Sequence, residues 1–179
     1  EISSDISLLR YYQVVVEDSW GLYSESNIQV GDSRNLFVKI LGGDQYGIGY
    51  SVQQTTDGGY ITLGGIGYDR DIGLIKTDFR GNEEWNKSFD TIEFERVSVQ
   101  QTTEGGYVLV GTVRNSGENR NDIWLLKTDT QGNEEWNKSF GVGIGYSVQQ
   151  TTDDGNIIVG DTQRNGNGDI ILIKTDNQE

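Results

Sequence analysis

An internal repeat places the strongest constraint on how this chain folds. The segment SVQQTTDGGYITLGG begins at Ser51, and close copies of it begin at Ser98 and Ser147. A second motif, DIxLxKTD, follows every copy. The copies recur roughly every 50 residues, which is the spacing of β-propeller blades. We therefore expect three copies of one structural unit.

Each repeat predicts four short strands separated by turns. The turns at 57–59, 104–106 and 153–155 are rich in Asp and Gly, which supply the positive φ that tight hairpins require. The apolar run of DIxLxKTD predicts a third strand that is buried on both faces. The fourth strand is EEWNKSF, inside the segment GNEEWNKSF, which occurs at 81–89 and 132–140 but not after the third DIxLxKTD. The prediction is an all-β fold of four-stranded, propeller-type blades, which must stack because one small sheet cannot bury both its faces.

The combined pattern SxQQTxDGGYxxxG…DxxLxKTDxxGNxxWxKxF extends over residues 35–179. It resembles the repeats of secreted β-propeller-like proteins of bacteria and archaea. The resemblance implies one blade per repeat, with boundaries near 44–90, 91–140 and 141–179. It names no substrate, because such repeats are scaffolds on which different surfaces are built.

The missing fourth strand has a diverged counterpart, NLFVKIL, at residues 35–41. The matched pairs are Phe37 with Trp85, Lys39 with Lys87, and Leu41 with Phe89. We interpret 35–41 as a displaced outer strand that completes the third blade of its own chain or of a neighbouring chain. Three blades are fewer than the usual four to eight, so closing a ring within one chain would need steep angles between the sheets. Strand exchange between chains, or membership of a larger assembly, are the alternatives.

Residues 1–34 contain strand-like segments outside the repeat frame, and we predict a β arm. It can be a hairpin that caps the repeat array, or a donor arm that adds a strand to a neighbouring subunit. The candidate assembly residues are Ile6, Leu8, Leu9, Val14, Val15, Val16, Phe37, Val38 and Ile40.

Charge limits the partners of the chain. It has 28 acidic and 14 basic residues, a net charge of −14, and such a surface repels nucleic acid. No apolar run is long enough to predict a membrane-spanning helix. The chain does not begin with Met, which we expect after signal-peptide removal or trimming. An extracellular or cell-surface location is the expectation.

Catalytic residues are scarce. The chain has no His and no Cys, which removes the commonest general base and the thiol nucleophile. The acidic pairs Glu83–Glu84 and Glu134–Glu135 are neighbours on predicted strands, so their side chains point to opposite faces and cannot act as an acid–base couple. We predict that the protein is not an enzyme.

Two kinds of modification or ligand site remain as candidates. Asp71, Asp122 and Asp169 follow oxygen-rich loops that could bind Ca²⁺, but the loops lack the twelve-residue calcium pattern and have the composition of ordinary turns. We expect no other cofactor. Asn86 and Asn137 begin Asn-Lys-Ser sequons on the outer strands, where N-glycosylation is possible in chemical terms.

The aromatic residues Phe37, Trp85 and Trp136 recur at one position of the repeat, so we expect them to pack between neighbouring sheets. A sugar-stacking role is the alternative, with the loops at 112–121 and 161–168 lining one rim. The sequence thus favours an exported structural protein that assembles with itself into oligomers or filaments by β-strand complementation. The alternative is a lectin-like propeller that binds glycans.

Overall fold

The structure is a computed structural model. It describes residues 10–17, 23–30, 37–41, 47–67, 71–89, 97–115, 120–164 and 167–176. The chain divides into two units, Glu1–Ile40 and Leu41–Glu179. The described residues form thirteen strands and no helix, so none of them forms a helix that could cross a membrane.

The first unit contains one antiparallel hairpin. Strand β1 (Arg10–Glu17) pairs with β2 (Tyr23–Val30), and Arg10 lies opposite Val30. The β arm predicted for residues 1–34 is therefore a hairpin in its described part, and Val14, Val15 and Val16 lie in β1. Ile6, Leu8 and Leu9 are outside the described residues.

Residues 37–41 belong to no strand. A strand is defined by its hydrogen-bonded ladder with a neighbour. Phe37, Val38 and Ile40 are exposed, large apolar residues of this segment. The predicted outer strand at 35–41 thus has no partner strand among the described residues, and residues 35 and 36 are not described.

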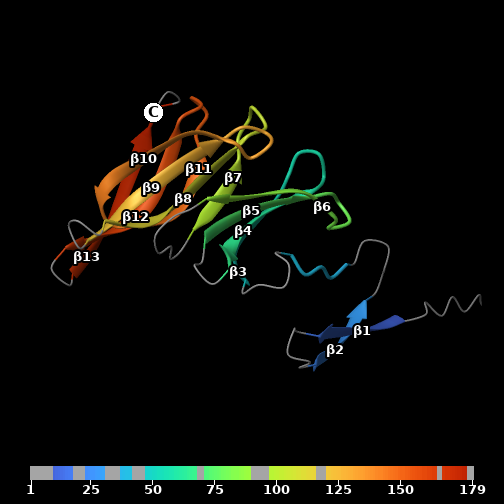
Figure 1. Cartoon of the computed structure of the whole chain (residues 1–179). Helices are drawn as coiled ribbons and strands as arrows, with labels where there is room; N and C mark the ends of the chain where they lie inside the picture. Colours follow the sequence, from blue (N-terminus) through green and yellow to red (C-terminus); the bar gives the residue numbers. More distant parts are fainter. Residues whose placement is uncertain are drawn as a thin grey trace, which may run out of the picture. The chain divides into compact units, whose positions relative to one another are not determined.

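The second unit contains three antiparallel sheets, one per repeat, in which successive strands pair in chain order (Figure 1). The first sheet consists of β3 (Gly47–Gln54), β4 (Tyr60–Ile66), β5 (Asp71–Thr77) and β6 (Glu83–Phe89). The second sheet consists of β7 (Ser98–Gln101), β8 (Tyr107–Asn115), β9 (Arg120–Thr128) and β10 (Glu134–Val142). The third sheet consists of β11 (Ile144–Gln150), β12 (Asn156–Arg164) and β13 (Asn167–Thr175).

The hairpin turns follow the predicted chemistry. Gly58, Gly105 and Asp154 occupy the same turn position and have φ of +87°, +91° and +62°. A backbone hydrogen bond closes the first turn, from Thr55 N–H to Gly59 O at 2.9 Å. The prediction that these positions require a positive φ is confirmed, and in the third repeat an Asp adopts it, which costs more than it would for Gly.

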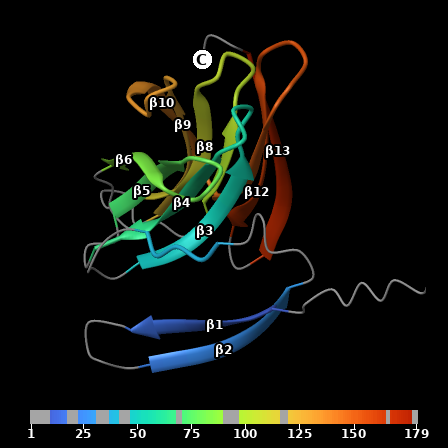
Figure 2. The ribbon, with the colours of Figure 1, turned by 90° about the vertical axis from the view of Figure 1, so that its right-hand side faces the viewer.

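The second sheet lies between the first and the third (Figure 2). One buried cluster joins the first two sheets: Ile61, Leu63, Ile72, Leu74, Val97, Val99, Tyr107, Leu109, Trp124 and Leu126. A second joins the second and third sheets: Val108, Val110, Ile123, Leu125, Val148 and Ile158. No hydrophobic cluster in the described part of the chain joins the third sheet to the first. The described sheets therefore form an open stack, and the closed ring of a propeller is not seen.

Strand β9 explains why the DIxLxKTD run is apolar without alternation. Ile123 and Leu125 face the third sheet, whereas Trp124 and Leu126 face the first sheet. Successive side chains of a strand point to opposite faces, so a strand between two neighbouring sheets needs apolar residues at every position. The prediction of burial on both faces is confirmed for this strand.

Candidate assembly surface on the third sheet

The outer edge of the third sheet is its most distinctive feature. Strand β13 pairs with β12 on one side, and no described strand pairs with its other side. The equivalent strands β5 and β9 have a partner on each side, because β6 and β10 cover their outer edges. Among the described residues, the third sheet therefore has three strands where the first two sheets have four.

The three outer edges differ in chemistry. Strands β6 and β10 both carry EEWNKSF, whose charged and polar residues are typical of strands that tolerate an exposed edge. Strand β13 carries Ile170, Ile171, Leu172 and Ile173 in succession. A long apolar strand with one free edge is a template for pairing with another strand.

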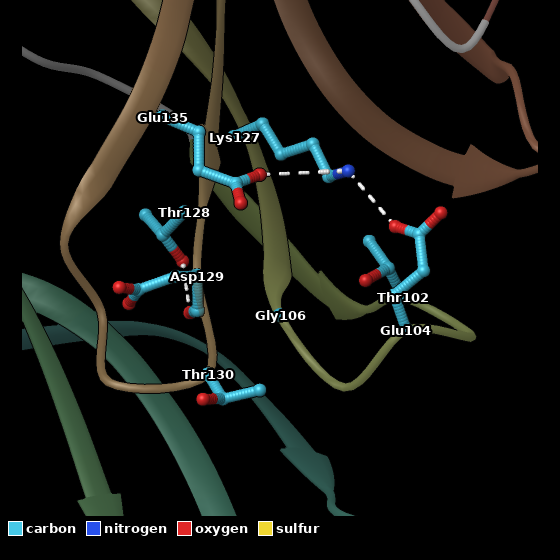
Figure 3. A pocket seen from close by; sticks show the side chains of 8 residues that line it. All are labelled: Thr102, Glu104, Gly106, Lys127, Thr128, Asp129, Thr130 and Glu135. Carbon is cyan, nitrogen blue, oxygen red and sulfur yellow. Dashed lines mark hydrogen bonds and ion pairs between the residues drawn. The ribbon is translucent and has the colours of Figure 1, made fainter.

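In the first two repeats, a lysine in the third strand ties the outer strand to the hairpin turn. Lys76 Nζ lies 2.8 Å from Asp57 Oδ2 in the turn and 2.8 Å from Glu84 Oε2 in β6. The equivalent contacts of Lys127 are 2.9 Å to Glu104 Oε2 and 3.5 Å to Glu135 Oε2 (Figure 3). These bridges place a carboxylate from the outer strand beside each lysine.

The third lysine has only one of these two partners. Lys174 Nζ lies 3.0 Å from Asp153 Oδ2 in the turn. No described fourth strand brings a second carboxylate to it. The Lys174 side chain is consequently 42% exposed, whereas that of Lys76 is 4% exposed.

The electrostatics of these clusters are those of permanent ion pairs. Burial acts to lower the pKa of Lys76, but its hydrogen bonds to Asp57 and Glu84 outweigh burial and raise the pKa above the usual value. The hydrogen bond from Lys76 is the main reason that the pKa of Asp57 falls to about 2. Burial likewise acts to lower the pKa of Lys127, but Glu104 and Glu135 outweigh burial and raise this pKa above its usual value. A lysine held protonated in this way is suited to joining strands and not to acting as a base.

A small cleft surrounds Lys127 (Figure 3). Its lining residues are Thr102, Glu104, Gly106, Lys127, Thr128, Asp129, Thr130 and Glu135. Its volume is about 130 Å³, below the several hundred Å³ typical of small-molecule sites. The cleft is best explained as the space around the ion-pair cluster.

The candidate calcium residues are not brought together. Asp71, Asp122 and Asp169 lie in β5, β9 and β13, one in each sheet. Asp122 is buried, and its Oδ1 lies 3.0 Å from Arg120 Nε. The described ranges hold no group of three or more acidic side chains able to bind a metal ion. Most of the oxygen-rich loop residues that precede these aspartates are outside those ranges.

The two sequons share one environment. Asn86 in β6 and Asn137 in β10 are exposed. Their Nδ2 atoms donate hydrogen bonds of 2.5 Å to Glu83 Oε1 and Glu134 Oε1, respectively. Both side chains lie at the surface on outer strands, and glycosylation of these residues stays a prediction.

The repeated tryptophans pack between sheets, as predicted. Trp85 packs against the first cluster, with its ring centroid 5.8 Å from that of Tyr107 in the second sheet. Gly132 has φ of +75°, and a Cβ there would lie 2.6 Å from the Trp85 ring. Trp136 packs in the same way against the second cluster. These two rings are used in packing, which weakens the interpretation of a sugar-stacking set.

The repeated Gln-Gln pair links neighbouring sheets, which the sequence reasoning missed. Gln53 Oε1 accepts a hydrogen bond from Gln101 N–H at 2.6 Å, and Gln100 Oε1 accepts one from Gln150 N–H at 2.6 Å. The side chain of the second Gln in each later repeat also accepts a hydrogen bond from the preceding sheet. The return bonds are Thr56 N–H to Gln101 Oε1 at 2.8 Å and Thr103 N–H to Gln150 Oε1 at 2.7 Å. The unchanged QQTT in all three repeats was the available signal.

Trp124 was also unassigned by the sequence pattern. It is buried in the first cluster, and its Nε1 donates to Asn137 Oδ1 at 3.4 Å. The other repeats have Gly73 and Ile171 at this position, so the packing between sheets is adjusted to each neighbour.

Comparison with known proteins adds no relative: no protein-family model matches the sequence, and no curated protein matches it significantly.

Proposed function

We propose that this chain is a structural protein that assembles with itself by β-strand complementation. A strand from a second copy lies along the outer edge of β13 and completes the third sheet. The observation that carries this proposal is the pairing difference among equivalent strands: among the described strands, β5 and β9 have two partners each, and β13 has one.

The donor that fits best is the segment 35–41. It aligns with β6 and β10, with Phe37 at the position of Trp85 and Trp136. Its residues Val38 and Ile40 are exposed, which suits a segment that pairs with another chain. The β1–β2 hairpin is a weaker donor, because each of its strands already has a partner along one edge.

One departure from the outer-strand pattern bears on the electrostatics. The segment 35–41 has Leu36 where β6 and β10 have Glu84 and Glu135. After complementation Lys174 would keep Asp153 as its carboxylate partner. The added strand is then held by its backbone ladder and its apolar side chains.

We propose further that the protein lies outside the cell or at the cell surface, as an oligomer or a filament in which the sheets act as propeller-type blades. Donation from one copy to the next is a head-to-tail contact. Such contacts produce a ring if the rotation closes and a filament if it does not.

The test is a single substitution in the donor. Val38→Pro removes a backbone N–H and cannot extend a ladder at that position, so we expect the variant to be monomeric when the unchanged chain is oligomeric in sedimentation-velocity experiments. Val38→Thr is the matched control, because it keeps the N–H and the β-branched shape, and it should assemble. Amide exchange at β13 gives a second readout: its outer amides should be protected only in the assembled forms. A monomer at every concentration, or unchanged assembly of Val38→Pro, would contradict the proposal.

A further inference from the structure

The open edge of β13 is accompanied by an apolar face of the third sheet that is largely exposed among the described residues. In β5 and β9 the residues that face the following sheet are fully buried: Ile72, Leu74, Ile123 and Leu125. The equivalent residues of β13 are Ile170, which is 86% exposed, and Leu172, which is 68% exposed. Val159 in β12 is exposed too, although its equivalents Leu63 and Val110 are buried. Scattered exposed apolar residues are ordinary, but here three positions of one contact face are exposed in one repeat and buried in the other two.

At the opposite end of the stack, the outer face of the first sheet is exposed at a position that is buried in the other two sheets. Val99 and Val148 are buried against the sheet that precedes theirs, whereas the equivalent Val52 in the first sheet is 65% exposed. A Cβ at Gly73 would lie 1.9 Å from Ile66 Cδ1. Ile66 therefore fills the place that Trp124 and Ile171 occupy in the later sheets, and it keeps the outer face of the first sheet apolar.

The Gln and Thr hydrogen bonds between sheets leave unused groups at both ends of the described stack, and the groups at one end match those at the other. By the repeat pattern, Gln149 Oε1 and Thr152 N–H should bond to the second Gln of a following sheet. No such bond is recorded for either group among the residues that the structure describes. At the other end Gln54 is the second Gln of a sheet that has no preceding sheet in the described stack. The groups missing at the third sheet are those that Gln54 of a first sheet supplies.

We propose that the third sheet of one copy packs face to face on the first sheet of a second copy, in the manner of the two internal interfaces. This inference rests on the proposed function, because the covering copy is the one that donates its strand. The chain connection supports that link. Strand β10 leads into β11 with only Gly143 between them, so an outer strand runs directly into the first strand of the next sheet. Residues 35–41 precede β3 in the same order, and a second copy seated on the third sheet delivers them to the edge of β13.

The occupant is a second copy because both halves of the interface are present on one chain. Joining two copies at both ends would place six sheets in one ring, within the four to eight blades of propellers. If the rotation does not close, the same interface produces a filament.

The chain has no Cys, so a pair of single substitutions tests this contact directly. In the internal interface Gln100 Oε1 touches Gln150 N–H, and the proposed equivalents are Gln149 of one copy and Gln54 of the other. A mixture of Gln149→Cys and Gln54→Cys proteins should form disulfide-linked dimers under mild oxidation, whereas either protein alone should not. Cross-linking in the mixture no greater than in the single proteins would overturn the head-to-tail interface.

A second variant distinguishes the packing of the sheet faces from the donation of the strand. Leu172→Asp places a charge on the uncovered face, and we expect it to weaken assembly by roughly 100-fold in dissociation constant. Phe79→Asp is the control, because Phe79 is also exposed, at 57%, and belongs to neither buried cluster, and it should assemble normally. If Leu172→Asp assembles normally while Val38→Pro does not, strand donation stands and the packing of the faces is overturned. If Val38→Pro assembles and the cysteine pair still cross-links, the faces pack and strand donation is wrong.

Discussion

The second and third sheets contain nearly the same strand in different surroundings. Strand β9 reads DIWLLKTD and β13 reads DIILIKTD over the shared motif. Leu125 is fully buried and Leu172 is largely exposed, although both occupy one motif position. In a stacked repeat each unit contacts only its neighbours, so the neighbours determine whether a given leucine belongs to the core or to the surface.

The two ends of the stack are not equivalent either. On the outer face of the first sheet, Thr62 and Gly73 replace the larger apolar residues Leu109 and Trp124 of the second sheet. The outward face of the third sheet keeps the full apolar set of an internal sheet. Of the two end faces, that of the third sheet therefore resembles an internal contact face more closely.

The largest expected difference between the second and third sheets is in the stability that is lost when an equivalent leucine is shortened. Leu125→Ala creates a cavity in a buried cluster and should lower the free energy of unfolding by about 2–5 kcal/mol. Leu172→Ala should lower it by less than about 0.5 kcal/mol in the monomer, since its side chain is mostly in water. Urea denaturation at concentrations below assembly measures both. Similar losses in the two variants would mean that the third sheet has an unrecognised cover.

A smaller difference in stability is expected when Lys76 or Lys174 is replaced. Lys76→Met removes the cation between Asp57 and Glu84 and should cost about 1–2 kcal/mol, less than for a fully buried pair because both carboxylates are half exposed. Lys174→Met should cost at most about 0.5 kcal/mol, since its single pair is exposed. Equal costs in urea denaturation would show that the outer-strand carboxylate contributes nothing.

The smallest effect is the dependence of stability on acid. The pKa of Asp57 and that of Asp153 both fall to about 2, from a usual value of 3.8. Because these folded-state values are depressed, the stabilisation is complete above pH 3.8 and is lost as the pH falls toward 2. The main cause for Asp57 is the buried Lys76, whereas for Asp153 it is the hydroxyl of Thr151, followed by the exposed Lys174.

Carboxyl NMR titration can separate these causes. In the monomer, high salt should weaken the contribution of the exposed Lys174 to the Asp153 pKa more than that of the buried Lys76 to the Asp57 pKa, because an exposed pair is screened more strongly. The larger contribution of the uncharged Thr151 hydroxyl to the Asp153 pKa should remain. Asp57→Asn should flatten the loss of thermal stability between about pH 4 and pH 2. An identical acid profile for this variant would contradict the assignment.

Much of the fold could be predicted because its signals are local. The Asp-Gly turns and the repeated strand pattern follow from short segments, and the structure confirms the pairing order within each sheet. The Gln–Thr bonds were missed because they join residues nearly one repeat apart. Trp124 was missed because its role depends on the space beside Asn137 in its own sheet and on the first sheet that it packs against.

The sequence alone determined that this chain forms three repeats of short antiparallel strands, because turn chemistry and strand periodicity act over a few residues. The tertiary structure decided which faces of those strands are covered. Identical motifs then diverge: Lys76 is enclosed by two carboxylates and Lys174 is not, and Ile123 is in the core while Ile170 is exposed. The physical reason is that burial depends on the neighbouring sheet, which no single repeat encodes.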